Sequence, residues 1–317
     1  MTLHLVGLGG TISMHDTDRG AVPSADASEI AARTGGFATA ESLEVLGGSE
    51  VDFPHLERLV AAVTRLIDTG AHGVVVTTGT DSIEEVSAWL SYREQWPIPV
   101  VVTGSMVAGA RSDSDGAANL ADAQAVADGI TVDPVVVFAG RIFSGREVIK
   151  TSGVERDAFG APGRGALGIV NSGEVRWHRV PERRKAHGAP IHPIRPVPIV
   201  ATGLGDDGAL LAAAGERHPA VVVAANGAGN LPPRSAEIAI ELVANGVLVV
   251  VTTRAPDARV GARYAYPGGG ATLVEGGVLL ASGLSPHRAR LLVTLGLAQG
   301  RDLNGLRALV NSEAEQP

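Results

Sequence analysis

The chain reads Gly73-Val74-Val75-Val76-Thr77-Thr78-Gly79-Thr80-Asp81-Ser82, an apolar run that ends in a turn rich in hydroxyl groups. A second apolar run ends in a similar way near the N-terminus, at Gly9-Gly10-Thr11-Ile12-Ser13. Each turn places a threonine beside glycine where a buried strand is predicted to end. Because ligands bind at the carboxyl ends of parallel strands in open α/β sheets, we expect Thr11 and Thr80 to face one pocket.

Apolar runs alternate with amphipathic segments through the first half of the sequence, which predicts a mainly parallel sheet with helices on both faces. The predicted strands are residues 3–8, 43–46, 73–77, 99–103 and 134–139. The predicted helices are residues 25–32, 55–68, 83–92 and 117–127. Residues 141–151 and 168–178 are rich in β-branched residues and turns, and they predict a hairpin region attached to this sheet.

A change of composition marks the expected domain boundary. Residues 181–198 contain five prolines and the basic run Arg183-Arg184-Lys185, which is typical of an extended, solvated connector. We therefore expect a larger N-terminal catalytic α/β domain at 1–180, a linker at 181–198 and a smaller C-terminal α/β domain at 199–317. The C-terminal domain has predicted strands at 199–202, 220–225 and 247–252 and predicted helices at 209–214, 235–244, 286–298 and 303–310. Its turn Pro267-Gly268-Gly269-Gly270 predicts a flexible loop.

Composition excludes several classes of protein. A formal charge of −8 and an aromatic content of 3% argue against a nucleic-acid partner, which needs a basic groove and stacking rings. The sequence has no cysteine, which rules out disulfides and thiolate catalysis. No segment reaches the ~18 consecutive apolar residues of a membrane span, so we expect no membrane contact. The N-terminus enters a strand without a signal-peptide pattern, so we expect a cytoplasmic protein.

Some of these motifs also have ordinary interpretations. The segment Asp81-Ser82-Ile83-Glu84 matches a capping box for the helix that follows it. Gly7-Leu8-Gly9-Gly10-Thr11-Ile12 is weak support for a dinucleotide site, because Ile12 stands where the third glycine should be. His187 and His192 match no zinc pattern, so we expect no metal and no cofactor. The sequence also lacks the G-x-S-x-G elbow of many serine hydrolases.

Further polar residues follow the predicted strands. Ser49 and Glu50 come after residues 43–46, and they supply a hydroxyl and a carboxylate. Lys150 would act as a base if the crevice kept its amine neutral, although a surface lysine is the ordinary expectation. Asn230 follows residues 220–225 and offers both a donor and an acceptor to a ligand.

Taken together, these residues resemble the bacterial-type L-asparaginase and glutaminase family, and its cytoplasmic type in particular. Gly9-Gly10-Thr11-Ile12 is similar to the first family signature, and the segment from Gly73 to Glu85 is similar to the second. Further matches are Val102-Thr103-Gly104-Ser105-Met106, Ser112-Asp113-Ser114-Asp115-Gly116-Ala117-Ala118-Asn119-Leu120, Lys150, Gly229-Asn230 and Ala281-Ser282-Gly283-Leu284-Ser285-Pro286. The likeness covers nearly the whole chain.

The resemblance implies hydrolysis of the side-chain amide of L-asparagine to aspartate and ammonia through an acyl-enzyme. It implies that Thr11 is the nucleophile and that Thr80, Asp81 and Lys150 form a second triad that transfers protons. The substrate-binding residues that it implies are Ser49, Glu50, Gly79, Asp81, Ser105 and Asn230. It also implies a homo-oligomer, a dimer or a tetramer, in which Asn230 acts at a subunit interface.

The sequence departs from the family pattern in two places. Family members commonly carry a tyrosine about ten residues after the first threonine, where this chain has Ala21, and His15 or a tyrosine of the second domain is the candidate replacement. Glu275 lies too close to the segment at 281–286 to match the glutamate that some members contribute from a neighbouring subunit. The departure at position 21 motivates an alternative, a non-catalytic or weakly active protein that binds aspartate or asparagine. A related enzyme acting on tRNA-bound glutamate is disfavoured by the acidic charge and by the position of Thr11 near Met1.

Overall fold

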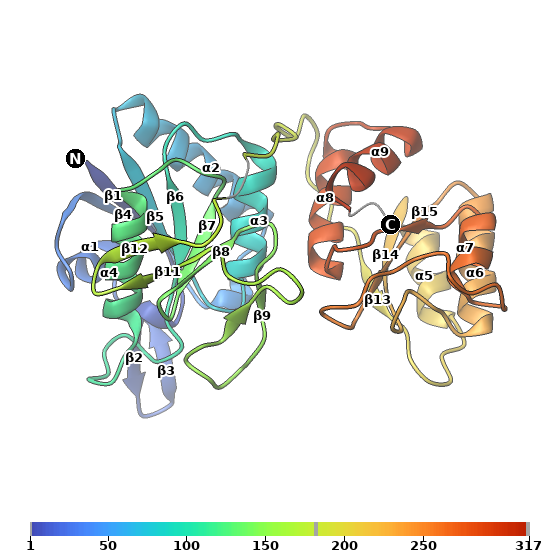
Figure 1. Ribbon diagram of the computed structural model, residues 1–317, viewed down its shortest axis with the longest axis horizontal. Coiled ribbons are helices and arrows are strands. Elements are labelled where there is room, and N and C mark those ends of the chain that lie inside the picture. The colour runs from blue at the N-terminus through green and yellow to red at the C-terminus, as the bar shows by residue number, and fades with distance from the viewer. Residues whose placement is uncertain (1, 181–182, 315–317) are drawn as a thin grey trace. The chain divides into compact units, whose positions relative to one another are not determined.

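Buried, valine-rich strands form the centre of both parts of the computed structural model, which describes residues 2–180 and 183–314. The chain divides into two units after Gly188 (Figure 1). This division falls inside the segment expected as a linker, and the expected domain limits stay predictions.

Within residues 2–180, eight strands form one sheet in the order β12-β11-β8-β7-β6-β5-β1-β4. Five of them are parallel: β1 (Leu3–Gly9), β4 (Phe37–Leu46), β5 (Gly73–Thr77), β6 (Val100–Thr103) and β7 (Val135–Phe138). The other three continue the sheet antiparallel: β8 (Arg141–Ser144), β11 (Gly168–Asn171) and β12 (Glu174–Trp177). Most of the expected hairpin region at 141–151 and 168–178 is therefore the antiparallel edge of the sheet, whereas residues 149–150 pair with residues 159–160 in a separate two-stranded sheet.

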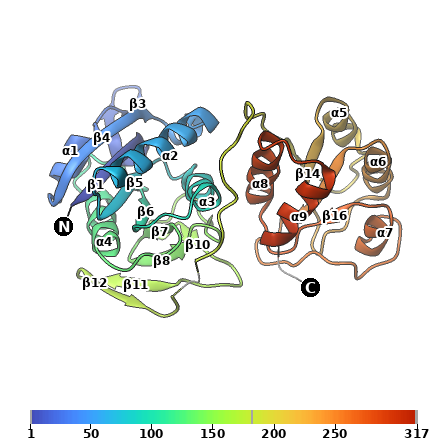
Figure 2. The same ribbon diagram turned by 90° about the horizontal axis from the view of Figure 1, so that it is seen from above.

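Helices cover both faces of this sheet, as Figure 2 shows. Buried residues of α1 (Ala27–Ala32) and α4 (Gly116–Ala127) belong to one apolar cluster with the sheet residues Leu5, Val75 and Val101. The opposite face carries α2 (Phe53–Asp68) and α3 (Ile83–Arg93), whose Phe53 and Trp89 rings meet edge to face with centroids 5.2 Å apart. Because β4, β1, β5 and β6 are adjacent and parallel, their carboxyl ends lie in a row at the same end of the sheet.

The second unit has a parallel sheet in the order β13-β14-β15-β16. Its strands are β13 (Ile199–Ala201), β14 (Ala220–Ala225), β15 (Leu248–Thr253) and β16 (Leu279–Leu280). One face packs on α5 (Ala209–Arg217), α6 (Pro233–Ala244) and α7 (Gly270–Glu275). The other face carries α8 (Pro286–Ala298) and α9 (Leu303–Glu313). Both units are α/β, as the sequence predicts.

The structure corrects the expectation of a flexible loop at residues 267–270. Gly268, Gly269 and Gly270 are buried, and α7 begins at Gly270. The carbonyl of Gly268 accepts a hydrogen bond from the Leu231 amide at 2.9 Å. A methyl group on Gly268 would lie 2.1 Å from the carbonyl oxygen of Leu231. Glycine here permits close backbone packing instead of mobility.

One further segment differs from the expectation. Residues outside the predicted strands and helices form an antiparallel hairpin, β2 (Met14–Thr17) and β3 (Gly20–Pro23). The connector contains no helix or strand over residues 183–198, where nearly all residues are exposed or half-buried, and its backbone is hydrogen bonded at two places. The His187 amide donates to Tyr92 in the first unit, and the Ile191 amide donates to Ala298 in the second. Residues 181–182 of the connector lie outside the described residues.

Candidate active site

The loops that follow β1, β4 and β5 meet through three glycines. Gly10 has a φ of +85°, and a methyl group there would lie 2.2 Å from the amide nitrogen of Gly79. A methyl group on Gly79 would lie 2.3 Å from the Cα atom of Gly48. Only glycine permits such close approach of three backbones. Gly10 and Gly79 are in backbone contact, and Thr11 and Thr80 are the residues that directly follow them.

Lys150 joins two of the predicted catalytic residues directly. It lies on the short strand β9 (Ile149–Lys150), which pairs with β10 (Phe159–Gly160). Its Nζ atom donates to Thr80 Oγ1 at 2.8 Å and to Asp81 Oδ1 at 2.7 Å. Thr80 is 6% exposed, whereas 66% of the Asp81 side chain is exposed. A hydroxyl, an amine and a carboxylate are therefore in contact at the end of β5.

Glu84 fixes the backbone from which Lys150 extends. Its Oε1 atom accepts a hydrogen bond from the Lys150 amide at 2.6 Å, so the first turn of α3 holds β9 in place. The capping-box interpretation of residues 81–84 is wrong. Ser82 is the N-cap of α3 and makes no side-chain capping bond, and Asp81 and Glu84 both contact Lys150 instead. The sequence alone does not reveal this role of Glu84, although the residue stands inside the second signature.

Thr11 begins a short 3₁₀ turn, η1 (Thr11–Ser13), directly after β1. Its carbonyl oxygen accepts a hydrogen bond from the Gly109 amide at 3.0 Å. Among the described residues, its hydroxyl has no hydrogen-bond partner, and the residue is half-buried. The Thr11 hydroxyl is thus available to a ligand, whereas the Thr80 hydroxyl is already paired with Lys150.

Two further predicted residues share the loop after β4. Ser49 and Glu50 lie on η2 (Gly48–Glu50), and both are exposed. The Glu50 Oε2 atom accepts a hydrogen bond from the Gly47 amide at 2.7 Å, which holds this carboxylate against its own turn. The contact between Gly48 and Gly79 brings this loop beside Thr80 and Asp81.

The remaining predicted residues are placed elsewhere. Ser105 follows β6, is fully buried, and donates its hydroxyl to the Val107 carbonyl at 2.9 Å. Asn230 belongs to the second unit, where its backbone pairs with that of Asn226. Among the described residues, the buried Oδ1 atoms of Asn226 and Asn230 have no hydrogen-bond partner. Asn230 therefore carries an unused acceptor.

No tyrosine occupies the hairpin that follows Thr11. Ala21 lies on β3, opposite Asp16, and is exposed. The Nδ1 atom of His15 lies 2.6 Å from the Ser24 hydroxyl. Tyr92 is fully buried in α3, and the other two tyrosines, Tyr264 and Tyr266, belong to the second unit. The structure thus leaves His15 as the candidate replacement on the hairpin itself.

In residues 2–180 and 183–314, no group of three histidine, aspartate or glutamate side chains could hold a metal ion. Over the same residues, no helix is long and apolar enough to cross a membrane.

Comparison with known proteins identifies the family. Residues 2–183 match the family described as "Asparaginase, N-terminal", and residues 196–310 match "Glutaminase/Asparaginase C-terminal domain". The chain belongs to the asparaginase family of amidohydrolases, which act on carboxamide C–N bonds. This result confirms the family resemblance drawn from the two threonine signatures.

Two curated relatives and one solved structure show how far the likeness extends. A probable L-asparaginase of Deinococcus radiodurans is 38% identical over 260 residues, which cover 80% of this chain and 79% of the relative. An L-asparaginase of Bacillus licheniformis is 30% identical over 312 residues, which cover 94% and 96%. The thermostable L-asparaginase from Thermococcus kodakarensis superposes over 100% of both chains with a TM-score of 0.88 and 26% identity.

Proposed function

We propose that this protein hydrolyses the side-chain amide of L-asparagine to L-aspartate and ammonia, with Thr11 as the nucleophile. The observation that carries the proposal is the contact of Lys150 Nζ with both Thr80 and Asp81, beside the loop on which Thr11 lies. Family membership and relatives named L-asparaginase support the same reaction.

The proposed chemistry uses both threonines. A threonine hydroxyl is a weak nucleophile until a base takes its proton. In this proposal the Thr80–Lys150 pair, whose contact of 2.8 Å supports the role, accepts the Thr11 proton when the amine is neutral. Thr11 Oγ1 then bonds to the amide carbon, while backbone N–H groups of the glycine turns stabilise the oxyanion. As the C–N bond breaks, the nitrogen takes that proton and leaves as ammonia. Water hydrolyses the ester, and its proton returns to Thr11 through the same pair.

Substrate binding falls to the loops around these groups. A zwitterionic amino acid needs a carboxylate for its ammonium and N–H or hydroxyl donors for its carboxylate. In this proposal Glu50 and Asp81 bind the ammonium, and Ser49 and the Gly79 backbone bind the carboxylate. Ser105 affects substrate binding indirectly, through the conformation of its own turn, because its hydroxyl already donates to the Val107 carbonyl.

Three further expectations belong to the same proposal. The protein is a cytoplasmic homo-oligomer, a dimer or a tetramer, in keeping with a solved relative named a probable cytoplasmic L-asparaginase from Campylobacter jejuni. Asn230 acts at a subunit interface, as the family resemblance implies. The domain limits are 1–180 and 199–317, with a linker at 181–198.

An ammonia assay run beside calorimetry tests the proposal. The purified protein should release one ammonia and form one aspartate for each L-asparagine consumed, and L-glutamine measured in parallel gives its substrate preference. Calorimetry with L-aspartate should show binding at the same site. Binding of aspartate without any ammonia release from either amide would contradict the proposal and favour an amino-acid-binding protein.

A further inference from the structure

The segment between β6 and α4 supports the backbone of Thr11 from outside the site. The amides of Gly109 and Ala110 donate to the carbonyls of Thr11 at 3.0 Å and Met14 at 3.2 Å. A methyl group on Gly109 would lie 1.9 Å from the Ile12 carbonyl oxygen, so the two backbones are in direct contact. Residues 109–110 therefore determine where the hairpin after Thr11 begins.

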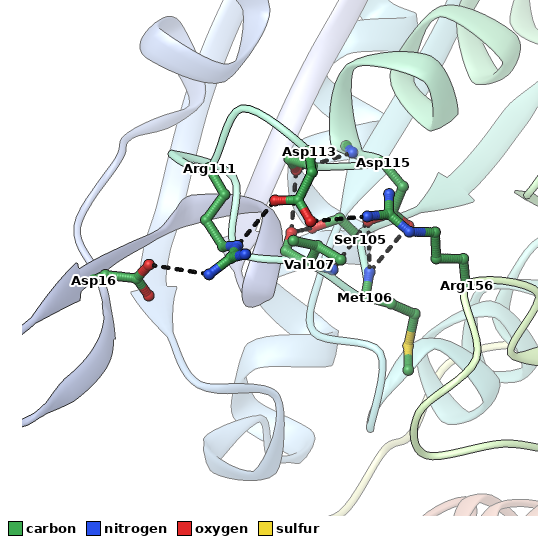
Figure 3. Close-up of polar contacts among 10 residues, drawn as sticks. Asp16, Ser105, Met106, Val107, Arg111, Asp113, Asp115 and Arg156 are labelled. Atoms are coloured by element: carbon green, nitrogen blue, oxygen red, sulfur yellow. Dashed lines mark hydrogen bonds and ion pairs between the residues drawn. The ribbon is translucent and has the colours of Figure 1, made fainter.

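Asp115 keeps this segment in shape, as Figure 3 shows. Its carboxylate accepts hydrogen bonds from the amides of Met106 at 3.1 Å and Val107 at 2.9 Å. It also accepts one from the Asn119 side chain at 3.0 Å. A carboxylate with three donors holds its loop firmly, because each charge-assisted bond is stronger than a neutral one. The segment between β6 and α4 is thus held in one conformation by Asp115, and it can hold other segments in place on both of its sides.

Asp16, Arg111, Asp113 and Arg156 form a chain of side chains whose charges alternate in sign (Figure 3). Arg111 lies 3.8 Å from Asp16 on β2 and donates to Asp113 at 2.9 Å. Asp113 accepts a second hydrogen bond from Arg156 at 3.1 Å. The hydrogen bond from Arg111 lowers the pKa of the Asp113 carboxyl below its ordinary value, so the pairing favours the charged form.

One end of this ion-pair chain is Asp16, on the hairpin that follows Thr11, and the other end is Arg156, in the turn that follows Lys150. Among residues 2–180 and 183–314, and apart from the pairing of β2 with β3, the contact between Asp16 and Arg111 is the only ion pair or side-chain hydrogen bond that joins residues 16–22 to a segment outside the hairpin. Arg156 lies in the turn between β9 and β10, which the Thr151 amide closes by donating to Ala158 at 2.7 Å. This turn begins directly after Lys150.

We propose that Arg111, Asp113 and Arg156 are positioning residues that hold the tip of the β2–β3 hairpin and the Lys150 hairpin closed around the substrate. Their effect on catalysis rests on the proposed function. An exposed ion pair is weak, but among the described residues the hairpin tip has no other side-chain anchor to a segment outside the hairpin. A shift of about 2- to 5-fold in the ratio of closed to open hairpin is therefore expected when the chain of charges is broken.

Amide hydrogen exchange tests this proposal without any need for turnover. In Arg111→Ala, exchange of the amides at residues 14–22 should be about 2- to 5-fold faster than in the unsubstituted protein. Raising the ionic strength should speed the same amides in the unsubstituted protein and leave Arg111→Ala unchanged, because salt screens exposed charges. Arg58→Ala is the matched control. Arg58 lies on α2, away from the hairpin, and makes a similarly exposed ion pair with Glu44 at 2.5 Å. Unchanged exchange in Arg111→Ala, or equal acceleration in Arg58→Ala, would overturn the proposal.

Steady-state kinetics separates this inference from the proposed function. If the protein hydrolyses L-asparagine, Arg111→Ala and Arg156→Gln should raise KM by about 2- to 5-fold with kcat retained, because fewer molecules are in the binding-competent state. An unchanged KM in both variants would contradict the positioning role while leaving the amidohydrolase intact. A protein without turnover whose hairpin still responds to Arg111→Ala would refute the proposed function alone.

Discussion

The Lys150 Nζ atom lies 2.8 Å from Thr80 Oγ1, although the two residues are 70 positions apart in the sequence. The amine also contacts Asp81 at 2.7 Å, so its position is defined by two bonds. A side chain that is 19% exposed and paired in this way is not an ordinary surface lysine. The ordinary expectation for Lys150 is therefore wrong, and the contact supports a role in proton transfer.

Replacing Lys150 by methionine should leave the fold intact and remove the proposed base. We expect kcat to fall by about 10²- to 10⁴-fold in Lys150→Met, the usual contribution of a general base. Lys185, the other lysine of the sequence, is exposed and provides the control. Lys185→Met should keep normal turnover, and a Lys150→Met protein with the same kcat as this control would remove Lys150 from the mechanism.

Glu84 should affect catalysis through the backbone of Lys150. In Glu84→Ala the Lys150 amide loses its 2.6 Å acceptor, and we expect kcat to fall about tenfold because β9 is no longer held. Glu84→Gln keeps an acceptor oxygen and should restore most of the rate. Equal kinetic defects in the two variants would show that the charge of Glu84, and not its hydrogen bond, is what matters.

The glycine contacts predict a cost for the smallest possible side chain. A methyl group on Gly79 would collide with Gly48, so Gly79→Ala should lower the free energy of unfolding by about 1–3 kcal/mol and displace the catalytic loops. Gly203→Ala is the control, because a methyl group there meets nothing within 4 Å. Chemical denaturation measures both variants. A Gly79→Ala protein as stable and as active as Gly203→Ala would show that the loops do not meet as described.

His4 predicts a specific dependence of stability on pH. Burial lowers the pKa of this histidine below its ordinary value of 6.5, and its Nδ1 atom lies 2.7 Å from the Thr39 hydroxyl. The unfolded chain therefore binds the proton first as the pH falls through 6.5, so the free energy of unfolding should decrease below that pH. His4→Asn removes the titrating group, and its unfolding free energy should decrease less between pH 7 and pH 5. Parallel curves for the two proteins would contradict this account.

The elements with strong local signals are predicted well. The strand β5 (Gly73–Thr77) and the helix α8 (Pro286–Ala298) have the predicted bounds. A valine run before a glycine turn defines β5, and Ser285 followed by proline starts α8, where the serine side chain accepts from the Arg288 amide. Local chemistry determines both elements, so one sequence is enough.

Elements that depend on distant partners are missed. The hairpin β2–β3 is largely exposed and has no apolar alternation to reveal it. The helix α7 begins at a buried glycine whose environment is set by Gly261, and a glycine run alone indicates only a loop. The ion-pair chain through Arg111 joins three separate segments, and no spacing rule within one segment predicts it.

The candidate site shows the same division. The order of Thr11, Thr80 and Lys150 along the chain indicates the family, and the strand ends bring their loops to one edge of the sheet. The role of Glu84 was hidden, because its position fits a helix cap equally well. The Glu84 carboxylate could cap its own helix or bind the Lys150 amide. Lys150 lies 66 residues away in the sequence, so only the fold shows that it is the partner.

Ammonia release by Thr11→Val and Thr80→Val tests the central claim most directly. Valine keeps the branched shape of threonine and replaces its hydroxyl with a methyl group, so both proteins should fold as the unsubstituted protein does. Thr64→Val is the control, since the Thr64 hydroxyl donates to the Val60 carbonyl within α2 and lies outside the proposed site. We expect turnover of L-asparagine to fall by at least about 10⁴-fold in Thr11→Val and by about 10²- to 10⁴-fold in Thr80→Val, with Thr64→Val unchanged. Near-normal turnover in either of the first two variants would contradict the account.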